Sequence, residues 1–417
     1  MALRTLVAAA FFALAMLAGA HASGIRPNAL DRSVDAIPVS ALLSAPASAL
    51  ADPARQLAAQ RLERWRTPTW IGMVALQILA LLYLWSSGLA ASLRDSVRRA
   101  IGNEFWTRAC FGAILVAVAN VAALVPRFIQ YRSLRAMTLS SELARGWTLH
   151  WFESTVLAMI AAGFIAAAVL WLADRTHHWY LYTTGAIVTA SLCITLANPV
   201  LFAPLFDRYS DLPLQGRLAP IAALRDRSHV GTVPFEEVHL APTTQLGTAF
   251  VMGAGPTQRV VISDSLLAAT TPAELRFISA RNLGHVERGD TVREALAEAV
   301  IAIFGIALAV FIADRVGFRR DDDAVSRLAL VGALLAGVYV LAVPLFNAYE
   351  RRLATNADAY AVALTGDRAA AVRAVIRMAD QHLVPVCPTL FTRAFFGAQP
   401  PTAQRVAELQ GRPAACP

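Results

Sequence analysis

The chain has 417 residues, of which 57% are hydrophobic and only 16% are charged, and its mean hydropathy is +0.51. Soluble globular domains carry about 25% charged residues, so this composition excludes an ordinary soluble protein and predicts a membrane protein. The formal net charge of +8 comes from arginine, because the sequence contains no lysine, and the arginines are spread over many segments. They indicate membrane topology and contact with membrane lipids, and no nucleic acid is expected as a partner.

Six apolar runs are long enough to cross a bilayer, which takes roughly 20 residues. They are residues 70–90, 109–125, 155–173, 179–197, 295–313 and 328–346. A shorter run within residues 1–22 reads either as a first transmembrane helix or as a cleavable signal peptide. The arginine count on alternate loops favours a multi-pass protein of a bacterial-type inner membrane, with its large segment on the cytoplasmic side. A cleaved signal peptide would put that segment outside.

The spans divide the rest of the chain into extramembrane parts. Residues 23–69 are expected to form a loop or weakly ordered linker followed by a short helix at 53–66. The further parts are four spans in 70–206, a domain at 207–294, two spans in 295–346 and the remainder of the domain at 347–417. Cys387 and Cys416 have no metal-ligand spacing and could at best form a disulfide, which would require an oxidising compartment.

Segment 207–294 is predicted to be a small α+β unit. A helix near 216–228 precedes three β-like segments at 237–240, 247–252 and 259–263. The sequence Thr271-Pro272-Ala273-Glu274 then combines an N-cap threonine, a proline at the first helical position and a carboxylate at the third. It predicts a helix that runs to about residue 288 and ends at Gly289.

This helix carries Arg281-Asn282-Leu283-Gly284-His285. Residues four apart share one helical face, and this spacing lets two histidines bind one zinc ion in a His-Glu-x-x-His motif. Here the spacing is present, but only His285 has a metal-binding side chain. Taken alone, one histidine on an amphipathic helix is more often structural than catalytic.

The order of these features resembles the type 1 CAAX prenyl proteases, which are integral-membrane zinc metallopeptidases. The similar elements are the membrane bundle, Ala-Pro-Leu-Phe-Asp-Arg at 203–208, the Gly-x-Gly turn at 253–255, segment 259–267, the Leu-Gly-His helix, segment 351–361, and Gln399-Pro400-Pro401 with Arg405. The resemblance covers most of the chain from about residue 55. It implies a mainly α, polytopic bundle of six or seven spans around a chamber, with a small α+β metallopeptidase-like domain that cleaves isoprenylated or other peptides.

Carried over residue by residue, the resemblance implies a degenerate zinc site. Arg281 stands for the first zinc-binding histidine, Asn282 for the catalytic glutamate at the general-base position, and His285 matches the second histidine. Ala354 stands for the third ligand, a glutamate, while Asp358 matches an aspartate that orients a zinc-binding histidine.

The resemblance also implies candidate substrate-binding residues. Thr248 stands for a substrate-side asparagine and Ala249 follows it at the start of the predicted edge strand. Gln399 stands for the histidine of a His-Pro-Pro motif, with Arg405 nearby in sequence.

The replacements have chemical consequences. A catalytic zinc normally has three protein ligands and a water molecule, whereas one ligand remains here. A guanidinium is always protonated, and an amide has no pKa near neutrality, so Arg281 cannot bind a cation and Asn282 cannot take a proton from water. We therefore expect no zinc and assign no catalytic residue with certainty.

Two points stay open in the sequence. Asp358 could pair with Arg281, so that an ion pair replaces the metal, or both side chains could reach solvent in the chamber. Zinc could also be held by His285 with other ligands, none of which has a compelling spacing: His239, Glu287, Asp290, Asp380 and His382.

The leading function is a catalytically inactive pseudoprotease that binds a membrane-associated or lipidated peptide, or a lipid. The alternatives are an active zinc metalloendopeptidase with atypical ligands and a carrier of lipids or small molecules.

Overall fold

The computed structural model describes residues 33–316, 323–413 and 416. Six of the described helices are long and apolar enough to span a membrane, and each overlaps one of the six predicted runs. They are α4 (Pro53–Ser86), α6 (Glu104–Ala122), α8 (Ala144–Arg175), α9 (Trp179–Ala197) with η2 (Asn198–Phe202) and α10 (Ala203–Phe206), α14 (Asp290–Val316) and α15 (Leu328–Thr365). The chain is an integral, multi-pass membrane protein. The predicted signal peptide or first helix at 1–22 lies outside the described residues.

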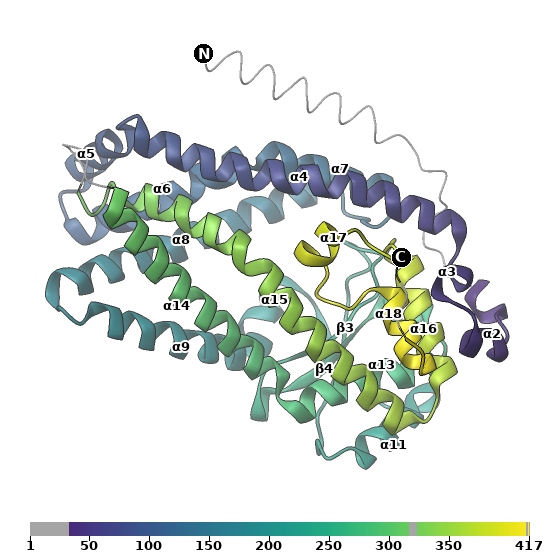
Figure 1. Cartoon of the computed structure of the whole chain (residues 1–417). Coiled ribbons are helices and arrows are strands. Elements are labelled where there is room, and N and C mark those ends of the chain that lie inside the picture. Colours follow the sequence, from purple (N-terminus) through teal and green to yellow (C-terminus); the bar gives the residue numbers. More distant parts are fainter. Residues whose placement is uncertain (1–32, 317–322, 414–415, 417) are drawn as a thin grey trace.

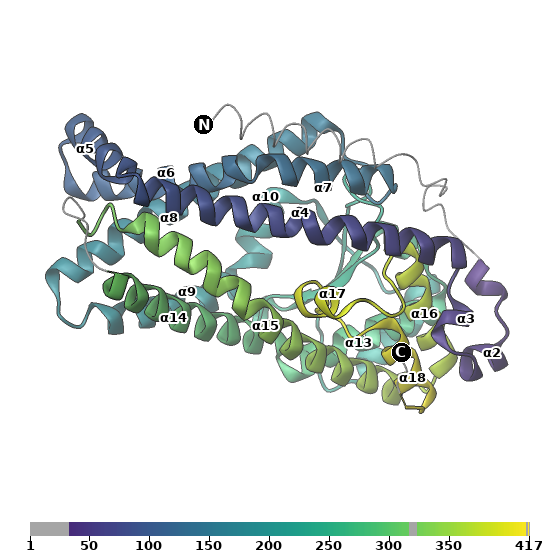
Figure 2. The same ribbon diagram turned by 45° about the horizontal axis from the view of Figure 1, so that its top comes forward.

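The spans gather toward one end of the molecule and the extramembrane domain occupies the other (Figure 1). Two shorter helices, α5 (Leu89–Ile101) and α7 (Leu124–Ala136), lie between consecutive spans. Helix α4 runs along nearly the whole length of the molecule (Figure 2). The sequence predicts a short helix at 53–66 that is separate from the first span, and this separation is wrong. Pro68 lies inside α4, and the Thr69 hydroxyl donates to the Trp65 carbonyl at 2.7 Å, which helps to hold the turn around it.

The expectation of a loop or weakly ordered linker is also wrong for residues 33–52. This segment forms η1 (Ser33–Ala36), α2 (Val39–Ser44) and α3 (Ala47–Leu50). Leu42 and Leu50 are buried, because α2 packs on α16 (Arg368–Gln381) and α3 on α18 (Thr402–Gln410). The apolar residues of the segment therefore belong to the domain core.

The domain contains a four-stranded sheet where the sequence predicts three strands. The strands are β1 (Tyr209–Asp211), β2 (Phe235–Val238), β3 (Ala249–Met252) and β4 (Arg259–Ser263), in the order β1-β2-β4-β3. Strands β2 and β4 are parallel and the other neighbours are antiparallel. Strand β2 starts two residues before the predicted segment, and β1 is too short and polar for its sequence to mark it. Strand β3 lies at the edge of the sheet.

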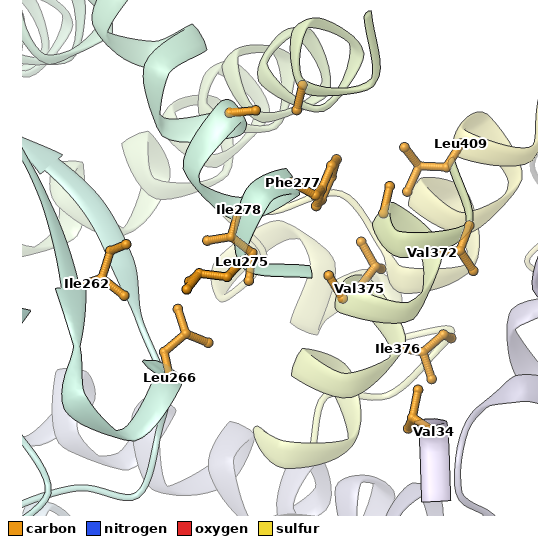
Figure 3. Packing of buried hydrophobic residues seen from close by; sticks show 14 of the residues in the cluster. Val34, Ile262, Leu266, Leu275, Phe277, Ile278, Val372, Val375, Ile376 and Leu409 are labelled. Atoms are coloured by element: carbon orange, nitrogen blue, oxygen red, sulfur yellow. The ribbon is translucent and has the colours of Figure 1, made fainter. Parts of the chain in front are cut away.

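Helix α13 (Pro272–Arg288) passes between the sheet and α16, and it positions the site (Figure 3). Leu275 and Ile278 lie toward Ile262 of the sheet, while Phe277 lies toward the C-terminal helices. The predicted capping box is present, and Gly289 ends the helix with a φ of 63°. The remaining elements are η3 (Gly216–Leu218), α11 (Ala219–Arg227), η4 (Gly255–Thr257), α12 (Asp264–Ala269) and α17 (Leu390–Phe395).

Candidate functional site

The candidate site lies where α13 packs against α15. The two helices approach closely at Gly284, since a Cβ atom added there would lie 2.8 Å from the ring of Tyr360. This contact requires glycine, and it brings Arg281 of α13 opposite Asp358 of α15 although 77 residues separate them in sequence.

A buried network of ion pairs occupies this interface. Arg281 Nε donates to Asp358 Oδ1 at 3.0 Å, so the predicted pairing is present. Arg405 of α18 donates to both oxygens of the same carboxylate, from Nε at 2.7 Å and from Nη2 at 2.9 Å. Arg281 Nη2 also donates to Gln399 Oε1 at 2.7 Å. Arg405 and Gln399, predicted as substrate-side residues, instead hold this network together, a role that their sequence positions did not indicate.

The network leaves one net positive charge at the interface. The side chains of Asp358, Arg405 and Arg281 are only 6%, 10% and 13% exposed. Burial lowers the pKa of Arg281 from its ordinary value, but a guanidinium remains protonated in proteins. Two cations therefore share one carboxylate, at the place where the resemblance puts the first ligand of a metal ion.

The other positions of the motif offer one metal-binding atom. Asn282 is buried and donates from Nδ2 to the carbonyl of Ile278 at 2.9 Å, one turn back along its own helix. Ala354 is buried and has no polar side chain. His285 Nδ1 lies 2.8 Å from Asp290 Oδ2. Because burial lowers the pKa of His285, the neutral ring donates from Nδ1 and keeps a lone pair on Nε2.

Of the other possible zinc ligands, Asp290 contacts His285 through the Nδ1 hydrogen bond, whereas His239 and Asp380 are held by other partners. His239 Nε2 lies 3.1 Å from the Ser210 hydroxyl, beside β1. Asp380 accepts from the backbone of Asp52 and from Gln56, and its burial raises the pKa to about 6. Within the described parts of the chain, no three His, Cys, Asp or Glu side chains are grouped so that they could hold a metal ion. These donors do not fit a catalytic zinc site.

Two of the predicted substrate-side residues, Thr248 and Ala249, lie at the edge of the sheet. Thr248 N donates to the Ser263 hydroxyl at 2.9 Å, and the Thr248 carbonyl accepts from Ser263 N at 2.9 Å. Ala249 begins β3, which packs against α13. Strand β3 pairs with β4 on one side and with no other strand among the described residues. An extended peptide could therefore add to this edge beside α13.

Comparison with known proteins agrees with this architecture. Residues 215–413 match the sequence model of Peptidase family M48. The Bacillus subtilis (strain 168) protein called uncharacterized metalloprotease YhfN is 24% identical over 335 residues, which cover 77% of each chain. The Arabidopsis thaliana CAAX prenyl protease 1 homolog is 21% identical over 268 residues and 62% of each chain. The crystal structure of S. mikatae Ste24p superposes with a TM-score of 0.73 at 16% identity, over 89% of this chain and 95% of that one.

The chain resembles the type 1 CAAX prenyl proteases, and its residues 215–413 match Peptidase family M48. Its fold is that of a helical membrane chamber with a small sheet domain, and its relatives are membrane metallopeptidases. Here Arg281, Asp358 and Arg405 form a cationic cross-link between α13, α15 and α18, at the position where the resemblance places the metal site.

Proposed function

We propose that this relative of the type 1 CAAX prenyl proteases binds a membrane-associated or lipidated peptide without cleaving it. The observation that carries the proposal is the buried Arg281–Asp358–Arg405 network, which puts a fixed cation where a zinc ligand would lie. Hydrolysis of a peptide by the family's chemistry needs a metal-activated water molecule and a general base. His285 supplies one lone pair, and Asn282 supplies no base.

Peptide binding needs none of the replaced groups. Backbone hydrogen bonds along an unpaired strand edge supply affinity, and neighbouring pockets supply specificity. Strand β3 keeps such an edge next to α13. A chamber walled by spans suits a peptide that is held at the membrane by a lipid group.

Zinc content tests the proposal most directly. Elemental analysis of the detergent-purified wild-type protein is expected to give far less than one zinc ion per chain. The matched variant combines Arg281→His, Asn282→Glu and Ala354→Glu, which restore two ligands and a base beside the native His285, the third ligand. We expect this variant to retain zinc, because His285 already has the correct spacing from residue 281.

Each result has a definite meaning. Near-stoichiometric zinc in the wild-type protein, with chelator-sensitive peptide cleavage, would overturn the proposal in favour of an enzyme with atypical ligands. Zinc in the variant alone supports a scaffold whose metal chemistry has been lost. If lipid co-purifies tightly and the protein shows no peptide affinity that depends on β3, the result would favour a carrier of lipids or small molecules.

A different observation supports a proposal for the side of the membrane on which the domain lies. Cys387 and Cys416 form a disulfide that ties the end of the chain to the segment before α17, and disulfides persist mainly in oxidising compartments. Positive charges mark the cytoplasmic side when they lie in short segments near the spans, and those of a large domain count little. The α5 region, on the side opposite the domain, carries Arg94, Arg98 and Arg99. In contrast to the cytoplasmic placement that the arginine count over all segments favours, we propose that the domain faces the oxidising side.

Cysteine labelling tests this orientation. In a Cys387→Ser variant, Cys416 is expected to react with a membrane-impermeant maleimide on intact cells. The two other cysteines lie within spans and provide the background, which a Cys387→Ser/Cys416→Ser variant measures. Labelling of Cys416 only after permeabilisation would place the domain in the cytoplasm.

A further inference from the structure

Helix α17 contacts two membrane spans, α4 and α15, at the same level of the bundle. It lies between α4 and α15 in both views (Figures 1 and 2). On the α4 side, the Trp70 ring centroid lies 6.1, 5.2 and 5.7 Å from those of Phe391, Phe395 and Phe396. On the α15 side, Asn347 Nδ2 donates to the Ala394 carbonyl at 2.8 Å. The short helix is therefore held by side chains from both spans.

Both spans change polarity where α17 contacts them. In α4 the charged residues lie before residue 67, and residues 70–86 carry no charge. In α15 residues 328–346 are uncharged, and charged residues begin at Glu350. Trp and other aromatic side chains concentrate where a bilayer meets water. The aromatic cluster around Trp70 therefore marks the headgroup level, and Leu390, which is 83% exposed, faces the same zone.

Two arginines that form no ion pair within the described residues line a cavity behind α17. The cavity has a volume of about 260 Å³, and Arg66, Arg393 and Arg405 contribute to its lining. Arg405 pairs with Asp358, which it shares with Arg281, whereas Arg66 and Arg393 form no ion pair in the part of the chain that the structure describes. The Arg66 guanidinium lies 4.2 Å from the centroid of the Phe396 ring. The cavity's one carboxylate, Glu63, accepts from the Thr389 backbone and hydroxyl.

Arg351 adds a third cation to this region. Its Nη1 donates to the carbonyls of Arg393 at 2.9 Å and Gly397 at 2.6 Å, so it binds the α17 backbone and no carboxylate among the described residues. Arg351 is half-buried, whereas Arg66 and Arg393 are exposed, so the three guanidinium groups form a cationic cluster beside the cavity. An anion bound in the cavity would neutralise part of this charge.

We propose that this cavity binds the phosphate of an anionic phospholipid between Arg66 and Arg393. Guanidinium groups bind phosphate oxygens in pairs, which suits a phosphodiester. A lipid is favoured over a soluble phosphate because the cavity adjoins an aromatic cluster and an exposed leucine at the level where spans become apolar. Acyl chains would lie along the apolar part of α4 while the headgroup enters the cavity.

The lipid site touches the ion-pair network. Gln399 lines the same cavity, and its Oε1 accepts from Arg281. A bound headgroup would therefore fix the loop after α17 that holds Arg281 in place. The proposal goes beyond the peptide-binding function and does not depend on whether the protein binds zinc.

Thermal stability of the delipidated, full-length protein in detergent tests the site. We expect phosphatidylglycerol to raise Tm by several degrees, while phosphatidylcholine and inorganic phosphate leave it unchanged. The Arg66→Gln/Arg393→Gln variant should lose this shift. The Arg64→Gln/Arg352→Gln variant removes two exposed arginines from the same two regions outside the cavity, and it should keep the shift.

Three results would overturn the proposal. An equal shift from inorganic phosphate would identify a free anion as the ligand. An equal phosphatidylglycerol shift in both double variants would show binding elsewhere, and no shift in the wild-type protein would exclude the site. If Arg66→Gln/Arg393→Gln does not fold, Arg66→Lys/Arg393→Lys takes its place, because it keeps both charges but lacks the paired guanidinium donors. Native mass spectrometry of the wild-type protein gives a second measurement, the number of phosphatidylglycerol molecules that each chain retains.

Discussion

Replacing Asp358 by alanine is expected to lower the free energy of unfolding by about 3–5 kcal/mol, since removal of one partner leaves buried charge uncompensated. Arg281 and Arg405 would then face each other without the carboxylate that now accepts three hydrogen bonds from them. Arg281→Ala should cost clearly less, because Arg405 still binds both oxygens of Asp358. SDS- or heat-induced unfolding of the detergent-solubilised protein measures both changes.

Two comparisons make this result specific. Asp226→Ala removes a carboxylate that is 68% exposed and paired only with Arg225, and exposed pairs contribute about 0–1 kcal/mol. Asp358→Asn keeps the shape but not the charge, and we expect a loss close to that of the alanine variant. If Arg281→Ala destabilises strongly while Asp358→Ala does not, the carboxylate is not the centre of the network.

Glu274→Ala is expected to destabilise the protein by a similar amount, about 3–5 kcal/mol, because it breaks a second buried charge pair. Glu274 is fully buried, and its Oε1 accepts from Arg377 Nε at 2.9 Å across the contact between α13 and α16. Its Oε2 accepts from the Thr271 backbone at 2.7 Å and completes the capping box. The same unfolding assay measures the effect.

Glu408→Ala provides the matched control, since this exposed carboxylate accepts a hydrogen bond from Gln404 and forms no ion pair within the described residues. Glu274→Gln retains an acceptor for the cap and should fall between the control and Glu274→Ala. Arg377 also pairs with Asp35, which moderates the loss. Equal stability of the Glu274→Ala and Glu408→Ala variants would show that the start of α13 is held by packing alone.

Local features of the sequence account for a large part of the fold. The six spans are recognisable because crossing hydrocarbon demands long uncharged runs, which few other structures need. Helix α13 is predicted at both ends because its capping residues and Gly289 act on neighbouring backbone groups. The shared face of residues 281 and 285 follows from helical periodicity alone.

Features that depend on distant partners were predicted less well. Residues 33–52 have a loop-like composition, yet they form short helices because α16 and α18 offer apolar surfaces to Leu42 and Leu50. Strand β1 consists of three residues and exists because β2 pairs with it. The break predicted within α4 is absent, since the helix continues through Pro68 along its neighbouring helices.

The candidate site divides in the same way. The sequence by itself determined that Arg281 and Asn282 stand where a metal-binding and a basic residue would be expected, and through the family resemblance it suggested Asp358 as a partner of Arg281. Only the tertiary structure decided that Arg405, 47 residues beyond Asp358, binds the same carboxylate from a third helix. The physical reason is that the sequence specifies the charges that are present, whereas the packing of α13, α15 and α18 determines which of these charged side chains share a buried space.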